Sequence, residues 1–262
     1  MDLLLQDKHA FVTGGSRGIG LAIARTLAHE GAVVSIGARD EQGLAAAVDA
    51  LAQEGLAAHP YVVDVTDSAG LEATVQQTAE DRDGRLDLVV ANAGGAQGGG
   101  LQDSTAEDWA ATLTLNVIHA TTLIRAALPF LSASSAGAAL VIASICGWKP
   151  RARSAYSVAK AAEIHLAPSL AVELAGEGVR VNALSPGAVM IPGGRWERTR
   201  DADPAAHDRF VADNLPGGRL VSLDEVADAA CFLLSPRAAG VNGAHLAVDR
   251  AQDRSTDRAV YP

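Results

Sequence analysis

The sequence is poor in lysine, cysteine and aromatic residues. Its 262 residues include three lysines among 21 basic side chains, two cysteines and 4% aromatics, and its formal net charge is −10. A nucleic-acid-binding surface needs a basic stripe, so we expect no nucleic-acid partner for this acidic chain. Cys146 and Cys231 lie far apart and without metal-ligand spacing. We therefore expect no bound metal, no disulfide framework and a reducing compartment.

Long hydrophobic runs and a targeting segment are also missing. The first eight residues lack the charged start, apolar middle and cleavage site of a signal peptide. No apolar run approaches the roughly 18 residues of a membrane span, so we expect a cytoplasmic protein that does not enter a membrane. The chain is 48% hydrophobic and 20% charged, which is typical of a globular protein, and we expect a single domain over residues 1–262.

Short apolar runs alternate along the chain with amphipathic stretches. The predicted strands are 9–13, 32–37, 61–65, 86–91, 138–144, 179–184 and 244–248. The predicted helices cover 20–30, 44–53, 68–83 and 223–234, and two more begin at Thr105 and Ser154, the latter expected to kink or end at Pro168. This alternation predicts an α/β fold, a doubly wound Rossmann-type parallel sheet of about seven strands with helices on both faces.

A glycine-rich turn, G-G-S-R-G-I-G at residues 14–20, directly follows the first predicted strand. Glycines let the backbone turn sharply and let a pyrophosphate approach the amides of a positive helix end. Alone the motif is weak, but its place between a strand and a helix favours a dinucleotide site over a structural turn. The candidate cofactor-binding residues in it are Gly14, Ser16, Arg17, Gly18, Ile19 and Gly20.

The tip of the second predicted strand indicates which dinucleotide binds. Ala38 and Arg39 stand where NAD-binding folds place an acidic residue that bonds the ribose. Arg39 and Arg17 together could face one phosphate, which favours NADP(H). NAD(H) is the alternative, if Asp40 bonds the ribose and both arginines are solvated.

Polar and small residues follow the next two predicted strands. Asp64, at the tip of the third, is placed to accept from the adenine amino group. Asn92 comes directly after the fourth, with the small residues Ala93 and Gly94, where a ribose can pass closely. Asn116 falls on an apolar helix face, where an unbonded amide costs free energy. It is either a satisfied structural residue or one that holds a water for proton relay.

The segment S-A-Y-S-V-A-K at residues 154–160 carries the clearest catalytic signal. In a helix, Tyr156 and Lys160 leave the same face about 6 Å apart along the axis. A free phenol titrates near pH 10, but an adjacent ammonium and the first turn of a helix favour its ionised form, which suits a general acid or base. Ser144, which ends the fifth predicted strand, could share the same substrate oxygen. The pattern is short, so an ordinary surface tyrosine and lysine are the alternative.

Taken together, these motifs resemble those of the short-chain dehydrogenase/reductase family in order and near its spacings, over nearly the whole chain. The matching residues are the T-G-G-S-R-G-I-G turn, Asp64, Val65, Asn92, Ala93, Gly94, Asn116, Ser144, Tyr156, Lys160, Pro186 and Gly187. The resemblance implies a Rossmann-fold oxidoreductase in which Tyr156 exchanges a proton with the substrate oxygen and Ser144 orients that oxygen. It further implies that Lys160 binds the nicotinamide ribose, that Asn116 supports a relay water, and that the protein is a homo-oligomer, a tetramer or a dimer, joined through the helices of Asn116 and Tyr156.

Three features depart from the family pattern. The interval from Ser144 to Tyr156 is one residue shorter than is common, which predicts a tighter loop. Ile191 stands in place of a threonine, so backbone groups near Val189 are expected to contact the cofactor carboxamide instead. The ending V-D-R-A at residues 248–251 replaces V-D-G-G, which leaves the final turn open.

We expect an NADP(H)-dependent oxidoreductase that interconverts a ketone and a secondary alcohol, with a general likeness to 3-oxoacyl-thioester reductases. An NAD-dependent alcohol or sugar dehydrogenase is the alternative, and a non-catalytic NADP-sensing regulator is a third possibility. Residues 190–215, polar and punctuated by proline, are expected to form an irregular lid over a small-molecule substrate. Its arginines, Arg195, Arg198 and Arg200, either lie in solvent or face an anionic substrate.

Overall fold

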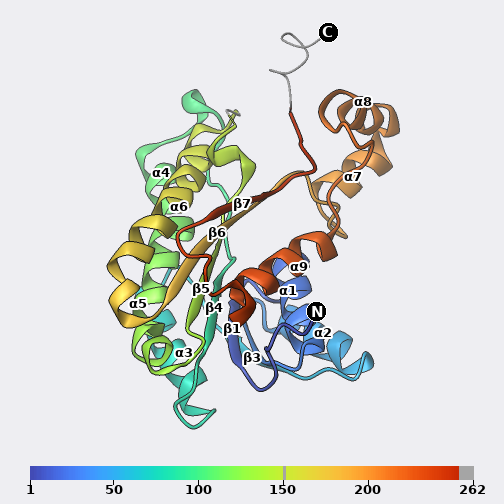
Figure 1. The fold of residues 1–262 in the computed structure, drawn as a ribbon. Coiled ribbons are helices and arrows are strands. Elements are labelled where there is room, and N and C mark those ends of the chain that lie inside the picture. The colour runs from blue at the N-terminus through green and yellow to red at the C-terminus, as the bar shows by residue number, and fades with distance from the viewer. Residues whose placement is uncertain (150–151, 254–262) are drawn as a thin grey trace.

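The computed structural model describes residues 1–149 and 152–253, which form one parallel sheet covered by helices (Figure 1). The strands are β1 (His9–Thr13), β2 (Val33–Ala38), β3 (Ala58–Val62), β4 (Leu88–Ala91), β5 (Ala138–Ile142), β6 (Arg180–Pro186) and β7 (His245–Val248). All neighbours pair in parallel, in the order β3-β2-β1-β4-β5-β6-β7. The doubly wound Rossmann-type sheet predicted from the sequence is therefore confirmed.

Helices cover both faces of this sheet (Figure 1). Helices α1 (Gly18–His29), α2 (Glu41–Gln53) and α9 (Leu223–Leu234) pack on one face. On the other lie α3 (Ser68–Glu80), α5 (His119–Ala133) and α6 (Ser154–Glu173), with α4 (Ala106–Leu113) against α6. Strand side chains alternate between the two cores, as Val12 and Phe11 illustrate, because successive side chains of a strand point to opposite faces.

Several predicted element boundaries were wrong by a few residues. Strand β3 covers Ala58–Val62 and not 61–65, because the Asp64 carboxylate accepts bonds from Thr66 N and Oγ1 and so closes a turn. Helix α3 is capped by Asp67, whose carboxylate accepts from Gly70 N, and not by Ser68.

Two strand ends near the predicted site also differ. Strand β5 ends at Ile142, because Ser144 instead caps a short 3-10 turn (Ile145–Gly147) by accepting from Cys146 N. Strand β6 continues to Pro186, where the sequence had predicted an end at residue 184. Both corrections keep Ser144 and Pro186 at the carboxyl edge of the sheet.

Two predictions about the long helices, one at Pro168 and one at Thr105, had different outcomes. Helix α6 does not end at Pro168 but continues to Glu173, and a kink at Pro168 stays a prediction. Thr105, where the sequence predicted a helix to begin, is the N-cap of α4 in a capping box with Asp108. The stretch Ala106–Ala133 meets the length and composition of a membrane span, a test that core helices of soluble proteins also meet.

Candidate active site

The glycine turn has positions at which a side chain would not fit. A Cβ atom at Gly15 would lie 2.7 Å from Ile36 Cβ, and one at Gly20 would lie 2.5 Å from Asn92 Nδ2. Gly14 and Gly18 have φ angles of +64° and +57°, a region that glycine enters without strain. These glycines bring the start of α1 directly over the end of β1.

Asn92 fastens this turn to the end of β4. Its side-chain Nδ2 donates to Thr13 O at 2.9 Å and to Gly14 O at 3.2 Å. Thr13 Oγ1 in turn accepts from the backbone N–H groups of Asn92 and Ala93, at 3.1 and 3.3 Å. The Asn92 amide thus shapes the turn, and a ribose would meet the backbone of Ala93 and Gly94 beside it.

The amides at the start of α1 suit a pyrophosphate. Arg17 occupies the N-cap position, and within the described chain no side chain caps the first N–H groups of this helix. Unpaired amides at a positive helix end are a preferred site for a phosphate. Together with the close-packed glycines, this geometry fits a dinucleotide held by residues 14–20, with Ser16 and Arg17 at its rim.

Arg39 and Asp64 lie together at the adenosine end of the predicted cleft. Arg39 is 72% exposed, and its Nη1 is 3.9 Å from Asp64 Oδ2. Bonds from Thr66, helped by Arg39, hold the pKa of Asp64 below its usual value. Val65 is buried behind it. The Arg39 guanidinium is therefore anchored only loosely and is open to a phosphate.

Ser144 and Tyr156 face one cavity of about 210 Å³ at the carboxyl edge of the sheet. The cavity brings together residues from the glycine turn, the ends of β5 and β6, helix α6 and the predicted lid. Its lining residues are Ile19, Ala143, Ser144, Tyr156, Pro186, Gly187, Val189, Ile191, Arg195 and Trp196. Candidates that are far apart in the sequence thus meet at one place.

Lys160 lies one turn beyond Tyr156 on helix α6, as the i, i+4 spacing predicted, and the structure shows that it is buried. Its Nζ is 5.7 Å from the centroid of the Tyr156 ring and donates to Ile142 O at 3.0 Å. The same ammonium is 2.8 Å from Oε2 of Glu163. Burial lowers the pKa of Lys160, but Glu163, together with Tyr156 and Cys146, outweighs this, so the pKa lies above its usual value. Burial raises the pKa of Glu163, although the charge of Lys160 acts to lower it.

Glu163 was not predicted as a site residue from the sequence, although its i, i+3 spacing from Lys160 was visible.

Asn116 holds the loop after β4 against a π-helical turn (Thr114–Ile118). Its Nδ2 donates to Gly95 O and Thr112 O, each at 2.7 Å, and its Oδ1 accepts from Gly95 N at 3.3 Å. Both amide donors are satisfied, so the side chain matches the structural alternative; the relay role stays a prediction. A Cβ at Gly94 would lie 2.7 Å from Asn116 Oδ1 and 3.1 Å from Lys160 Nζ, so this loop passes close to Lys160.

The segment expected to be an irregular lid contains two helices, α7 (Arg195–Ala202) and α8 (Pro204–Asn214), which stand beyond one end of the sheet (Figure 1). Trp196 stacks on Phe210 with ring centroids 4.0 Å apart. Arg195 lines the Ser144 and Tyr156 cavity, whereas Arg200 pairs with Asp201 at 3.0 Å. Of the predicted lid arginines, Arg195 is therefore the one that borders the site.

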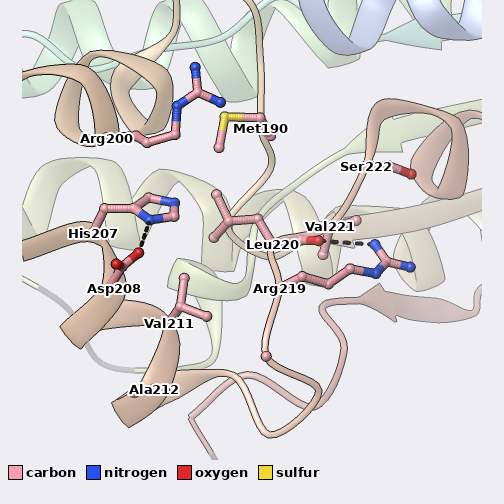
Figure 2. A pocket seen from close by; sticks show the side chains of 11 residues that line it. Met190, Arg200, His207, Asp208, Val211, Ala212, Arg219, Leu220, Val221 and Ser222 are labelled. Carbon is pink, nitrogen blue, oxygen red and sulfur yellow. Dashed lines mark hydrogen bonds and ion pairs between the residues drawn. The ribbon is translucent and has the colours of Figure 1, made fainter. Parts of the chain in front are cut away.

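A second cavity of about 580 Å³ lies between α7, α8 and residues 218–222 (Figure 2). Its lining includes Leu220 and Val221, with Met190 beside Arg200 and with His207 facing Leu220. In the sequence, Met190 lies between Val189 and Ile191, and both of these neighbours line the first cavity. Among the described residues, no group of three or more His, Cys, Asp or Glu side chains is placed to hold a metal ion.

The unusual ending V-D-R-A forms a strained turn held by ion pairs. Arg250 and Ala251 have φ angles of +51° and +60°, which cost energy for residues with a Cβ. Asp249 pairs with Lys149 at 2.6 Å, and Arg250 pairs with Glu225 at 2.6 Å. The turn is therefore made without glycine, and it fastens the chain end to the loop before α6.

Comparisons with known proteins agree with this geometry. Residues 14–250 match the family model described as enoyl-(acyl carrier protein) reductase. The chain is 35% identical over 246 residues to a 3-oxoacyl-[acyl-carrier-protein] reductase of Vibrio harveyi, covering 94% of this chain and 97% of that protein. It is 36% identical over 248 residues to a 2-(S)-hydroxypropyl-CoM dehydrogenase of Xanthobacter autotrophicus, covering 94% and 96%.

Solved structures give the same result. L-sorbose reductase from Gluconobacter frateurii, complexed with NADPH and L-sorbose, superposes with a TM-score of 0.89 and 31% identity over 97% of this chain and 99% of that one. The relatives are named dehydrogenases and reductases, and the site holds the serine, tyrosine and lysine expected from the sequence. This chain therefore belongs to the short-chain dehydrogenase/reductase family of oxidoreductases that act on CH–OH and C=O groups.

Proposed function

We propose that the protein is an NADP(H)-dependent oxidoreductase that interconverts a small ketone and the matching secondary alcohol. The observation that carries this proposal is the cavity into which Ser144 and Tyr156 both face, with Lys160 buried behind the tyrosine. The glycine turn contributes Ile19 to the same cavity. A dinucleotide held by that turn would therefore reach the reacting groups.

Tyr156 and Ser144 act on the substrate oxygen in this scheme. When bound, the nicotinamide cofactor supplies or accepts the hydride. In reduction the Tyr156 hydroxyl gives its proton to the carbonyl oxygen, and in oxidation the phenolate takes the proton from the alcohol. The Ser144 hydroxyl donates to the same oxygen and fixes its position. The Lys160 ammonium favours the phenolate by direct charge attraction.

The preference for NADP(H) is supported by the charge and exposure of two arginines. Arg39 follows β2 directly and is 72% exposed, with only a distant pairing to Asp64. Arg17 is exposed at the start of α1. A 2′-phosphate carries two negative charges that suit such a pair. The NADPH named in the complex of L-sorbose reductase is consistent with this preference.

The proposal extends to the assembly and the location of the protein. Val158 and Val172 of α6 are 48% and 79% exposed, and Ile118 before α5 is 46% exposed. Apolar side chains that gather on exposed helices often mark an interface between subunits. We propose a cytoplasmic homo-oligomer joined through α5 and α6, with residues 190–215 as the lid of each active site.

Replacing Tyr156 by phenylalanine tests the catalytic assignment. The variant should lose turnover of ketones and alcohols by at least about a hundredfold, because positioned acid–base groups contribute roughly 10² to 10⁴. Its binding of NADPH, followed by the change in cofactor fluorescence, should stay within about twofold of the parent. Turnover that survives the change would contradict the role of Tyr156, whereas cofactor binding without turnover in the parent would favour a regulator.

A further inference from the structure

The lysine of the catalytic pair has a buried carboxylate beside it. Glu163 follows Lys160 by one helical turn, and its Oε2 and Oε1 lie 2.8 and 3.1 Å from Lys160 Nζ. The two side chains are 4% and 2% exposed. Ile142 O accepts a further bond from the ammonium. Lys160 is thus held between a strand carbonyl and a carboxylate.

Stability alone does not account for this ion pair. Burying charges is expensive, and apolar replacements of a buried pair are often neutral or stabilising. The other buried residues of α6 are mostly alanines: Ala155, Ala159, Ala167 and Ala171. An apolar side chain at position 163 would suit that face at less cost. The carboxylate is explained if the ammonium must stay charged where water does not reach it.

The titratable groups that face Lys160 come from three elements. Tyr156 and Glu163 share helix α6 with it, Cys146 belongs to the turn after β5, and His119 comes from α5. Burial, followed by the charge of Lys160, lowers the pKa of His119 to about 3, so this imidazole is neutral at physiological pH. Of these groups, Glu163 is the one whose oxygens contact the Lys160 ammonium in the described part of the chain.

We propose that Glu163 is a positioning residue that keeps Lys160 protonated and aimed at Tyr156; this inference rests on the proposed function of that pair. Without the carboxylate, burial favours loss of the lysine proton. Tyr156 then loses the cation that stabilises its phenolate. Nζ lies 5.7 Å from the ring centroid, so loss of its charge removes an attraction that favours the ionised phenol.

The experiment uses the full-length protein, four test and control variants, and a fifth variant that assigns the NMR signal. Glu163→Gln and Glu163→Leu remove the charge in two different ways, and Glu163→Asp keeps it. Glu173→Gln removes the same charge from the exposed end of the same helix and serves as the matched control. Because the chain contains three lysines, lysine enriched at Cε gives an NMR spectrum in which Lys160→Met assigns the signal of Lys160.

Two measurements decide the outcome. In the neutral variants, the Lys160 signal should titrate at lower pH than in the parent, and the acidic limb of the pH profile for alcohol oxidation should move to higher pH. Glu163→Asp and Glu173→Gln should retain the parent behaviour in both. An unmoved lysine titration in the neutral variants overturns the proposal, as does failure of both neutral variants to fold, which would make the role structural. The lysine titration requires no turnover, so it tests the role of Glu163 even if the proposed reaction is wrong.

Discussion

Replacing Gly20 by alanine should disrupt the cofactor site, because the first turn of α1 has no room for a Cβ atom. That atom would press on Gly14 O and lie 2.5 Å from Asn92 Nδ2. The Asn92 amide is the group that bonds Thr13 O and Gly14 O. The added methyl group therefore forces apart the glycine turn and the amide that fastens it.

The expected size follows from three opposing contributions. Overpacking costs about 2 kcal/mol, and loss of a hydrogen bond of Asn92 costs about 1 kcal/mol. Alanine is favoured over glycine in a helix by about 1 kcal/mol, which leaves a net loss of about 2 kcal/mol. For a chain of this size that lowers the melting temperature by about 4 to 8 °C. A displaced turn that loses one bond to a charged phosphate should bind NADPH roughly 10 to 100 times more weakly.

Gly176→Ala is the matched control, because a Cβ at Gly176 meets nothing within 4 Å. Thermal unfolding followed by circular dichroism and a fluorescence titration with NADPH measure the two effects separately. Gly176→Ala should match the parent in both. If Gly20→Ala melts with the parent and binds NADPH equally well, the close-packed geometry described for the turn is refuted.

Three further outcomes follow from single contacts. Arg39→Ala should weaken NADPH binding roughly 10- to 100-fold and leave NADH binding unchanged, measured by titrating both cofactors; an equal loss for both would refute the phosphate role. Ala251→Gly should raise the melting temperature slightly, since relief of strain at φ +60° outweighs the added chain entropy; an unchanged or lower value would contradict that strain. Bonds from Arg219 lower the pKa of Glu225 to about 2. A lowered carboxyl pKa stabilises the fold above the unfolded value near 4.5 and loses effect as the pH falls toward 2. Glu225→Gln should therefore lower the free energy of unfolding at pH 7 and lower it less at pH 2, as measured by urea unfolding. An equal decrease at both pH values would count against the pairing.

The order of the elements could be predicted from the sequence because each buried strand is a short apolar run. Strands such as β1 and β5 are buried along their whole length, as is typical of parallel sheets covered on both faces. The glycine turn was equally visible, since its spacing reflects steric limits within a few residues. Where structure is determined by neighbours in sequence, the prediction was therefore close.

The boundaries that were wrong depend on single side-chain bonds. Asp64 closes a turn onto Thr66, Asp67 caps α3, and Ser144 caps the turn after β5. Each carboxylate or hydroxyl competes with the backbone for the same N–H groups. A run of apolar residues does not show whether the side chain or the backbone accepts these bonds. The predicted strand ends therefore differ from the observed ends by as much as three residues.

Contacts between distant segments could not be predicted from the sequence. Lys149 and Asp249 are 100 residues apart, and their pairing joins the turn after β7 to the segment before α6. Nothing in either neighbourhood indicates the other, because the two residues are brought together by the strand order β5-β6-β7 of the sheet.

Glu163 illustrates the opposite case, in which the spacing was visible but its meaning was not. A glutamate three residues from a lysine on a helix usually forms an exposed pair worth a few tenths of a kcal/mol. Here the same spacing lies on the buried face of α6, where the partner is the lysine behind Tyr156. Burial changes the pair from a minor surface contact into the group on which the charge of Lys160 depends. Tyr156 and Lys160 can thus be found by motif, whereas the carboxylate that contacts the lysine is recognised only from how the helix packs.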